Sequence, residues 1–355
     1  MKLKPGILLT LAVFVLNPEV STANDGFGQL GAGGIVLEKT DDIAMAKEIL
    51  DIGYDKITVE YEFVNESAKA IQTTVSFPLP KYPLVNCEAP FTRYPQPNDF
   101  AIWINAKKLS DFKTQVFAWQ NGKDVTQELI KMGFTANDIA LQPYNESIIN
   151  CDGHEFVISE EQQADLKSKG LTKTYQYNNG KNLVDYNVPE WDVQIIYQWQ
   201  QLFPAKSKVR VKHSYTPFVS VGTASDFLGS GSTQDFKPFC LTPRQKLKLQ
   251  QLYAQKKNLT AFGVNGTIVD YILQTANSWK DGIRDFTLRI HTRAEDEIVG
   301  LCFDKKLTKV KPNLYEVKLS HYHPNKDLSV YFGNSQLTYS EFEKKSLGKL
   351  PDLRQ

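Results

Sequence analysis

Apolar and polar residues alternate along several long stretches of this chain, which is the pattern of half-buried β-strands. From Lys56 the sequence reads KITVEYEFVNESAKAIQTTVSFPLP, with apolar residues at every second position of 57–63. Turn-forming residues at 65–67 and a second apolar run at 71–77 predict an antiparallel hairpin with one buried face. The hairpin ends at Pro78, as strands commonly do at proline.

Similar runs predict further strands on both sides of a more helical middle. FAIWINAKKL at 100–109 and TQVFAW at 114–119 precede this middle, and VQIIYQWQQLF and SKVRVKHSY follow it between 193 and 215. Near the C-terminus, DFTLRIHT, NLYEVKLSHYH and DLSVYFG show the same patterning.

Four segments have helical features. DVTQELIKMGF at 124–134 repeats apolar residues at helical spacing, and the segment from Ser159 to Gly170 begins with a capping residue and ends at glycine. Thr242-Pro243 is an N-cap followed by proline at the first helical position, and it opens RQKLKLQQLYAQKK. NGTIVDYILQTANSW, at 265–279, is interpreted as a second helix of this C-terminal region.

These elements divide into two predicted domains. Residues 24–223 form a β-sandwich-like N-terminal domain with a partly helical insertion at about 121–185. The Gly- and Ser-rich segment 224–236 is the predicted linker. Residues 237–345 form a smaller α+β or sandwich C-terminal domain with two helices and β-strands, and 346–355 form a tail. The predicted fold class is therefore mainly β with helical insertions.

The first 23 residues have the pattern of a secretory signal peptide. Lys2 and Lys4 precede the apolar run GILLTLAVFVL, and the small residues Ser21 and Ala23 occupy the positions that a signal peptidase reads. This run is shorter than the about 20 apolar residues that a membrane-spanning helix needs, and no later run is long enough. We therefore expect a periplasmic or secreted mature chain that begins at Asn24 and has no membrane span.

The charge balance argues against nucleic acid as a partner. The chain has 41 Lys and Arg and 40 Asp and Glu, a net charge of +1. Cleavage before Asn24 removes two lysines and one glutamate, which brings the net charge to zero. A neutral chain has no long-range field to steer nucleic acid or an anionic membrane towards it.

Four cysteines, Cys87, Cys151, Cys240 and Cys302, predict two disulfides in an exported chain. Three pairings are possible. Cys87 with Cys151 and Cys240 with Cys302 is the favoured pairing, because each pair lies within one predicted domain. The absence of a CxxC motif makes zinc and thioredoxin-type sites the weaker interpretation.

Several dispersed motifs together resemble a known family. They are GAGGIVLEKTDDIAM after the leader, the strand end SFPLP, WQQLFPAKSKVRVKHSYTPFVSVG, and the C-terminal series YILQTANSW, DFTLRI, GLCFD and DLSVYF. In this order they resemble the uncharacterised exported bacterial family catalogued as domain of unknown function 4424, from Asn24 to about Gly333. The family typically has GGL where this chain has Gly33-Gly34-Ile35. The resemblance implies a periplasmic or secreted β-rich protein and supplies no catalytic residues.

The candidate metal ligands are His321 and His323 in KLSHYHPNKD. Residues two apart on a strand share a face, so both imidazoles could reach one ion, with Asp327 as a third ligand. The alternative is that both are exposed at a strand end marked by Pro324. The alternative is favoured, and no metal or other cofactor is expected.

No catalytic residue can be assigned from motifs. His154 and His213 are candidate bases, but the chain has no GxSxG elbow, and a cysteine held in a disulfide cannot act as a nucleophile. Carboxylates cluster at 295–297 and at Glu190 and Asp192, a composition that exposed turns also have.

Aromatic residues make up 12% of the chain, and four of them are the candidate ligand-binding residues: Trp119, Trp191, Tyr197 and Trp199. They could line a groove for sugars, peptides or another protein. Alternatively they fill the β core, which is the commoner fate of aromatic residues in strands.

Two classes of function are compatible with this sequence. The favoured class is an exported, non-enzymatic binding or interaction protein of the cell envelope, whose partner is a protein, peptide or glycan. The alternative is an exported hydrolase or metal-dependent enzyme with a site that no motif reveals. The absence of a nucleophile, metal or phosphate motif favours the first class.

Export can be tested directly. If residues 1–23 are a signal peptide, the protein recovered from the periplasm or medium will begin at Asn24, as N-terminal sequencing or intact-mass measurement will show. Mature protein that retains Met1 would contradict the assignment.

Overall fold

The computed structural model describes residues 26–31, 34–37, 39–83, 99–141, 159–178, 181–223, 239–256 and 265–334. Strands dominate these residues, and the helices are short or few, which confirms the predicted mainly β class with helical insertions. The predicted leader lies outside the described residues.

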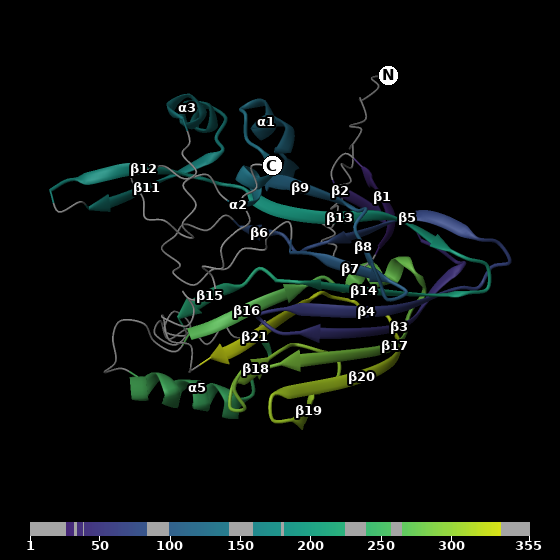
Figure 1. Ribbon diagram of the computed structural model, residues 1–355. Coiled ribbons are helices and arrows are strands. Elements are labelled where there is room, and N and C mark those ends of the chain that lie inside the picture. The colour runs from purple at the N-terminus through teal and green to yellow at the C-terminus, as the bar shows by residue number, and fades with distance from the viewer. Residues whose placement is uncertain are drawn as a thin grey trace, which may run out of the picture.

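An eight-stranded sheet forms the centre of the molecule. Its strands appear one below another in Figure 1. In spatial order they are β19 (Thr308–Lys311), β20 (Leu314–Tyr322), β17 (Lys280–His291), β3 (Ile43–Ile52), β4 (Ile57–Asn65), β14 (Lys208–Tyr215), β7 (Ala101–Ile104) and β8 (Lys107–Leu109). Only the β17–β3 pair in this sheet is parallel among the described pairings.

Three further sheets complete the β structure. The seven-stranded sheet has β10 (Lys123–Asp124), β9 (Lys113–Gln120), β13 (Asp192–Phe203), β5 (Ile71–Pro78), β1 (Gly26–Gly31) and β2 (Gly34–Leu37) in order, and β6 (Tyr82–Pro83) also pairs with β13. The four-stranded sheet has the order β15 (Ser220–Thr223), β16 (Asn265–Tyr271), β21 (Leu328–Asn334) and β18 (Ile298–Gly300). β11 (Thr172–Asn178) and β12 (Leu183–Pro189) form a separate hairpin.

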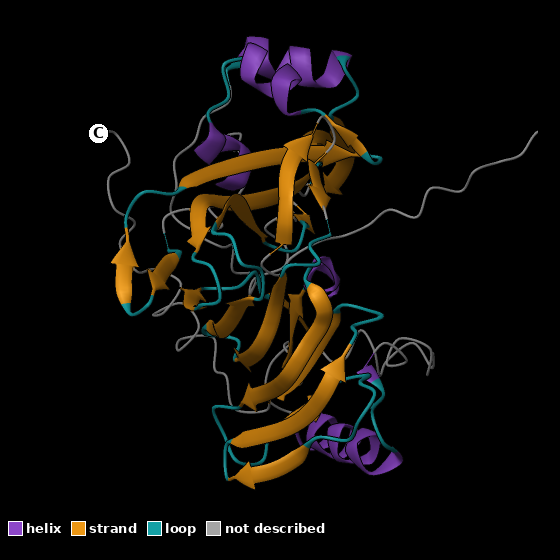
Figure 2. Cartoon of the chain, turned by 90° about the vertical axis from the view of Figure 1, so that its right-hand side faces the viewer, coloured by secondary structure: helices purple, strands orange, loops and turns teal. Residues whose placement is uncertain are grey.

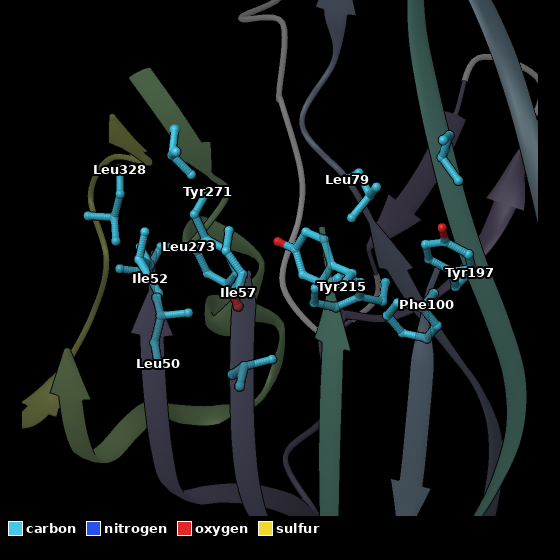
Figure 3. Packing of buried hydrophobic residues seen from close by; sticks show 14 of the residues in the cluster. Leu50, Ile52, Ile57, Leu79, Phe100, Tyr197, Tyr215, Tyr271, Leu273 and Leu328 are labelled. Atoms are coloured by element: carbon cyan, nitrogen blue, oxygen red, sulfur yellow. The ribbon is translucent and has the colours of Figure 1, made fainter. Parts of the chain in front are cut away.

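The inner face of the eight-stranded sheet packs against the seven-stranded sheet and against the four-stranded sheet, and Figure 3 shows residues from both contacts. Towards the seven-stranded sheet, Phe63 of β4 contacts Phe203 of β13 with ring centroids 5.8 Å apart. Towards the four-stranded sheet, the Tyr61 and Tyr271 hydroxyls lie 3.1 Å apart. One continuous hydrophobic core therefore joins the three sheets.

The hairpin predicted at 57–77 is wrong, because its two strands belong to different sheets. β4 pairs with β3 and β14, whereas β5 pairs with β13 and β1. Asn65 sits at this corner with its side chain fully buried. Its Nδ2 donates to the carbonyl oxygens of Lys69 (2.8 Å) and Phe203 (2.9 Å), and its Oδ1 accepts from the Ser67 backbone N–H (2.9 Å). These bonds turn the chain out of one sheet and into the next.

A second crossing lies beside the first. The chain leaves β13 at Phe203 and enters β14 at Lys208, so it also passes from the seven-stranded to the eight-stranded sheet. Backbone hydrogen bonds from Asn65 to Ser207 (3.0 Å) and from Lys206 to Ser67 (3.2 Å) join the two crossings. Together they close one end of the sandwich.

The central sheet extends across the predicted domain boundary. β3 lies in the predicted N-terminal domain and β17 in the predicted C-terminal domain, yet they pair over most of their length. The two predicted domains therefore do not contain separate sheets, because alternation along a strand identifies its buried face but not its neighbour. The predicted linker at 224–236 lies outside the described residues.

The predicted helix at 265–279 is also wrong. Its first half is β16, which pairs with β15 and β21, and only Gln274–Ser278 forms a short 3₁₀ helix. The β-branched run Thr267-Ile268-Val269 favours a strand, and burial between two neighbouring strands prevails over the helical spacing of later residues.

The other predicted helices are present. They are α1 (Thr126–Lys131), α3 (Glu160–Ser168) and α5 (Pro243–Lys256), and α2 (Ala136–Leu141) is a further short helix of the predicted insertion. Ser159 and Gln162 form a reciprocal capping box at the start of α3. Figure 2 shows the helices at opposite ends of the sheets.

A disulfide links Cys240 and Cys302, with their Cα atoms 4.9 Å apart, as predicted for this pair. It joins the start of α5 to the chain after β18, where Gln245 also donates to the Val299 carbonyl at 2.8 Å. Cys87 and Cys151, the other predicted pair, lie outside the described residues. Among the helices of the described part, none is long and apolar enough to cross a membrane.

The buried amide at the corner provides a stability test. Asn65→Ala leaves the Phe203 carbonyl and the Ser67 N–H without their partners, so we expect the free energy of unfolding to fall by about 3 kcal/mol. Lys69→Ala is the matched control, since only its backbone takes part in the corner and its side chain is exposed. Denaturant titration of both variants will measure the difference, and an equal effect would contradict the role of Asn65.

Candidate functional site

The outer face of the eight-stranded sheet carries rows of opposite charges. The polar positions of β4, which are Thr58, Glu60 and Glu62, all point away from the core. Glu60 lies opposite Lys212 of β14, and Glu62 lies opposite Arg210. Salt bridges of 2.7 Å and 3.3 Å join these pairs. We call this surface the charged face.

Two adjoining hollows on the charged face form one shallow groove. Their volumes are about 420 and 550 Å³. They share four lining residues, Lys56, Thr58, Glu60 and Lys212, so the second hollow continues the first. The other polar or aromatic residues of the groove are Asp51, Tyr54, Asp55, Tyr61, Trp103, Arg210, Ser214, His291, Thr292 and Arg293.

The floor of the groove consists of interior strands. β3, β4, β14 and β7 each have a neighbour on both sides. Their backbone N–H and C=O groups are therefore used within the sheet, and a ligand can be bound only by side chains. Those side chains stand in register across the floor, as in the row Glu60, Lys212 and Trp103.

A tight turn between β3 and β4 forms one end of the groove. Gly53 and Lys56 exchange two backbone hydrogen bonds, of 3.0 and 3.2 Å, which place Tyr54 and Asp55 at the tip. The Tyr54 hydroxyl donates to Glu297 Oε1 at 2.7 Å. The turn is thereby attached to a loop more than 200 residues later in the chain.

Arg293 completes this attachment, and we call Tyr54, Asp55, Arg293 and Glu297 the turn cluster. Arg293 Nε donates to Asp55 Oδ2 at 2.7 Å, and Nη2 of the same guanidinium pairs with the other carboxylate oxygen. The guanidinium also lies 4.3 Å from the Tyr54 ring centroid, a cation–π contact. Its backbone N–H donates to Glu297 Oε2 at 2.8 Å. Each polar group of the cluster thus has a fixed partner.

Burial governs the ionisation of this cluster. The Glu297 side chain is buried, and burial raises its pKa above the ordinary value, although the hydrogen bond from Tyr54 and the backbone N–H of Arg293 act in the opposite direction. Burial, followed by the charge of Glu297, raises the pKa of Tyr54 as well. Tyr54 is therefore protonated around neutral pH and donates its hydrogen bond to Glu297.

The opposite end of the groove is formed by the β7–β8 turn and Trp103. Asn105 and Ala106 adopt positive φ angles of 48° and 66° at this turn. Asn105 is held to Arg210 of β14 by its backbone N–H (2.8 Å) and by its Oδ1 atom, which accepts from the Arg210 N–H at 2.9 Å. Trp103 is half-buried and lines the groove beside Ala106.

The ionic groups of the groove are paired with one exception. Lys212 pairs with Glu60, Arg210 with Glu62, and Arg293 with Asp55, while His291 Nε2 lies 2.6 Å from Asp51 Oδ1. Among the described residues, the exposed side chain of Lys56 has no ion-pair partner within 4 Å. The groove therefore presents one lysine without a salt bridge to the described residues, at the end formed by the β3–β4 turn.

The four candidate ligand-binding aromatics do not lie in this groove. Trp119, Trp191, Tyr197 and Trp199 have exposed fractions of 7, 3, 1 and 3%. Tyr197 stacks on Phe100 with ring centroids 3.9 Å apart. Burial, the commoner fate, holds for all four: Tyr197 and Trp199 pack between the sheets. Trp191 contacts Phe134 of the helical insertion, and Trp119 lies under the Lys81 ammonium group.

The histidine pair at the end of β20 does not form a recognisable metal site. His321 and His323 are both exposed, and a φ angle of 51° at His321 interrupts the alternation of the strand. The carboxylate of Asp327 accepts from the backbone N–H groups of Leu273 (2.9 Å) and Gln274 (3.1 Å) instead. Within the described part of the chain, no three His, Cys, Asp or Glu side chains are grouped to hold a metal.

The candidate catalytic bases also lie away from the groove or outside the described residues. His213 has an exposed fraction of 0% and contacts Phe77 and Trp199 with ring centroids 4.8 and 5.3 Å away. A substrate cannot reach an imidazole in this position. His154 lies outside the described residues, and of the acidic cluster at 295–297, Glu297 belongs to the turn cluster.

Sequence reasoning did not identify Lys56, Trp103 or three members of the turn cluster, Tyr54, Asp55 and Arg293. One signal was available in β4 and β14, two of the strands that form the floor. Thr58, Glu60 and Glu62 alternate with apolar residues in one run, and Lys208, Arg210 and Lys212 do so in another. Opposite charges in matching alternation favour neighbouring strands.

The motif series noted in the sequence is matched by a family model. The model of the family described as domain of unknown function (DUF4424) matches residues 23–331. The chain belongs to this family. No curated protein matches the sequence.

Two solved structures have distant similarity to this DUF4424 chain. One is a Legionella pneumophila protein to which a nutrient-binding role is attributed, with 13% identity over 88% of this chain and 72% of that one, and a TM-score of 0.38. The other is yeast LTA4 hydrolase, with 9% identity over 82% of this chain and 29% of that one, and a TM-score of 0.23. Neither TM-score is high enough to carry an argument about fold or function.

The raised pKa of Glu297 predicts a pH dependence. Between the ordinary pKa of a glutamate and the raised value, only the folded state keeps the proton, so this group's contribution to the free energy of unfolding falls as pH rises through that window. Glu297→Gln should remove this part of the slope. Denaturant titrations from pH 4 to pH 7 will test it, with the exposed neighbour change Glu295→Gln as control. Parallel slopes for wild type and Glu297→Gln would contradict the prediction.

Proposed function

We propose that this protein is an exported, non-enzymatic binding protein of the bacterial cell envelope, and that its ligand binds in the groove of the charged face. Export rests on the signal-peptide pattern of residues 1–23. The partner classes remain a protein, a peptide or a glycan.

The observation that carries the proposal is the preorganised lining of the groove. Ion pairs fix Lys212, Arg210 and Arg293, and the hydrogen bonds of the turn cluster fix one end wall. Side chains that are held in place before binding lose little conformational entropy when a ligand arrives. A polar surface built in this way is suited to recognising a hydrogen-bonding ligand.

A second candidate function is an exported hydrolase, and one contact favours it. The 2.6 Å contact between His291 and Asp51 resembles the base–carboxylate half of a catalytic triad. Such a pair needs a nucleophile or an activated water on the free side of the imidazole. Among the described residues, no Ser, Thr or Cys side chain is hydrogen-bonded to His291. Binding is therefore the better supported function.

The proposal is tested by filling the groove. Thr58→Trp places a large side chain on the floor, whereas Thr74→Trp places one on the outer face of the seven-stranded sheet and serves as control. We expect at least one member of a panel of neutral and acidic oligosaccharides, amino acids and short peptides to raise the melting temperature of wild type and Thr74→Trp, but not of Thr58→Trp.

Three results would contradict the proposal. A panel in which nothing binds wild type, or a ligand that binds Thr58→Trp as well as wild type, would argue against the groove. Conversion of a bound ligand into products, lost in His291→Ala, would establish the hydrolase alternative.

A further inference from the structure

The lining of the groove also indicates the chemical class of its ligand, an inference that rests on the proposed function. Four basic side chains line the two hollows, and salt bridges join three of them, Lys212, Arg210 and Arg293, to carboxylates. The fourth is Lys56, whose exposed ammonium group has no ion-pair partner among the described residues. A ligand that places a negative group there gains a charge-assisted hydrogen bond without breaking an existing ion pair.

The position of Lys56 is well defined. Its backbone exchanges two hydrogen bonds with Gly53, and the residues between them are held by Glu297 and Arg293. Ile57, the next residue, has its side chain fully buried. Only the Lys56 side chain is therefore free to adjust to a ligand.

Trp103 supplies a contact of a different kind at the far end. It is the aromatic side chain of the charged face that lines the second hollow, and it lies two strands across from Glu60. A half-buried indole offers a flat apolar surface with a polar edge, on which a ring can lie. Thr58 and Ser214 add hydroxyl groups between this surface and Lys56.

Lys56 and Trp103 can contact the same ligand, because both line the second hollow. Their backbones are well separated: Lys56 lies four residues from Glu60, about 13 Å, and Trp103 lies two strand spacings from Glu60, about 10 Å. An oligomer of several rings can therefore lie along the groove and contact both side chains.

The structure also narrows the class of oligomer. A peptide that adds a strand needs a free sheet edge, and the floor strands β3, β4, β14 and β7 are all interior. A nucleic acid needs many phosphate contacts, and the lining offers one unpaired cation. A protein that binds a sugar oligomer needs a flat apolar surface for the rings and hydrogen-bond partners for the hydroxyl groups. For an acidic sugar it also needs a cation for the acidic group.

We propose that the groove binds an acidic oligosaccharide, with a carboxylate or sulfate group on Lys56 and a sugar ring on Trp103. The negative group distinguishes this ligand from neutral glycans, and the ring contact distinguishes it from simple anions. Carboxylate and sulfate share the same chemistry at Lys56, so the experiment includes both.

Calorimetry with the full chain tests this proposal. The probes are an oligogalacturonate of several rings, its fully methyl-esterified neutral form, and a sulfated oligosaccharide of similar length. We expect wild type to bind one of the two acidic probes at least about tenfold more tightly than the neutral ester. A gain of about tenfold in affinity is what one hydrogen bond to a charged group commonly contributes.

Substitutions of Lys56 and Trp103 test the two proposed ligand contacts separately. Lys56→Gln should remove the tenfold preference for the acidic probe, and Lys56→Arg should retain it. Trp103→Ala should weaken the acidic and the neutral form alike, and Trp103→Phe should restore part of that loss. Lys113→Gln makes the same charge change on the exposed end of β9, in the other sheet, and should have no effect.

The outcomes separate this inference from the proposed function. Equal binding of acidic and neutral probes by wild type, or an equal loss in Lys56→Gln and Lys113→Gln, overturns the ligand class. The ligand class is also overturned if none of the three probes binds wild type, while other ligands bind wild type and do not bind Thr58→Trp. If no ligand at all depends on the groove, the proposed function itself fails.

Discussion

The buried side chain of Asn65 is the interaction on which the rest of this structure depends. It ends β4, and its amide bonds to the chain on both sides of the corner and to the carbonyl of Phe203 in the neighbouring crossing. The two crossings are therefore linked by the Asn65 side chain and backbone. Because they carry the chain between sheets, they set the pairing of β4, β5, β13 and β14 and so the outer face on which the groove lies.

Ion pairs reinforce this corner from the C-terminal part of the chain. Glu66, the next residue, pairs with Arg284 (2.6 Å) and Lys280 (2.8 Å) of β17. The hydrogen bonds from Arg284 and then Lys280 lower the pKa of Glu66 to about 2, so the carboxylate stays ionised down to strongly acidic pH. The turn cluster makes a similar connection at the other end of β4, between Tyr54 and Glu297. Residues far apart in the sequence thus fix both ends of this strand.

The ion pairs of the charged face order its side chains more than they stabilise the fold. Each exposed pair contributes little to stability alone, because solvent screens it. Their arrangement in register nevertheless holds long side chains in defined positions across four strands. Lys56 is distinctive on this face because it has no salt bridge among the described residues, so a ligand that binds its ammonium group breaks no existing ion pair.

The sequence by itself determined the mainly β class, the family and the capped helices α3 and α5, because each depends on local pattern or on motifs in a fixed order. It left three disulfide pairings possible, and the tertiary structure places Cys240 beside Cys302. It also showed which positions of a strand face inward. It did not determine strand partners, since alternation is the same whichever neighbour covers a face. The hairpin at 57–77 failed for this reason, and for the same reason the pairing of β3 with β17 across the predicted domain boundary was not foreseen. Only the tertiary structure brought Lys56, Trp103 and Arg293 to one groove, because their proximity depends on pairings between segments up to about 240 residues apart.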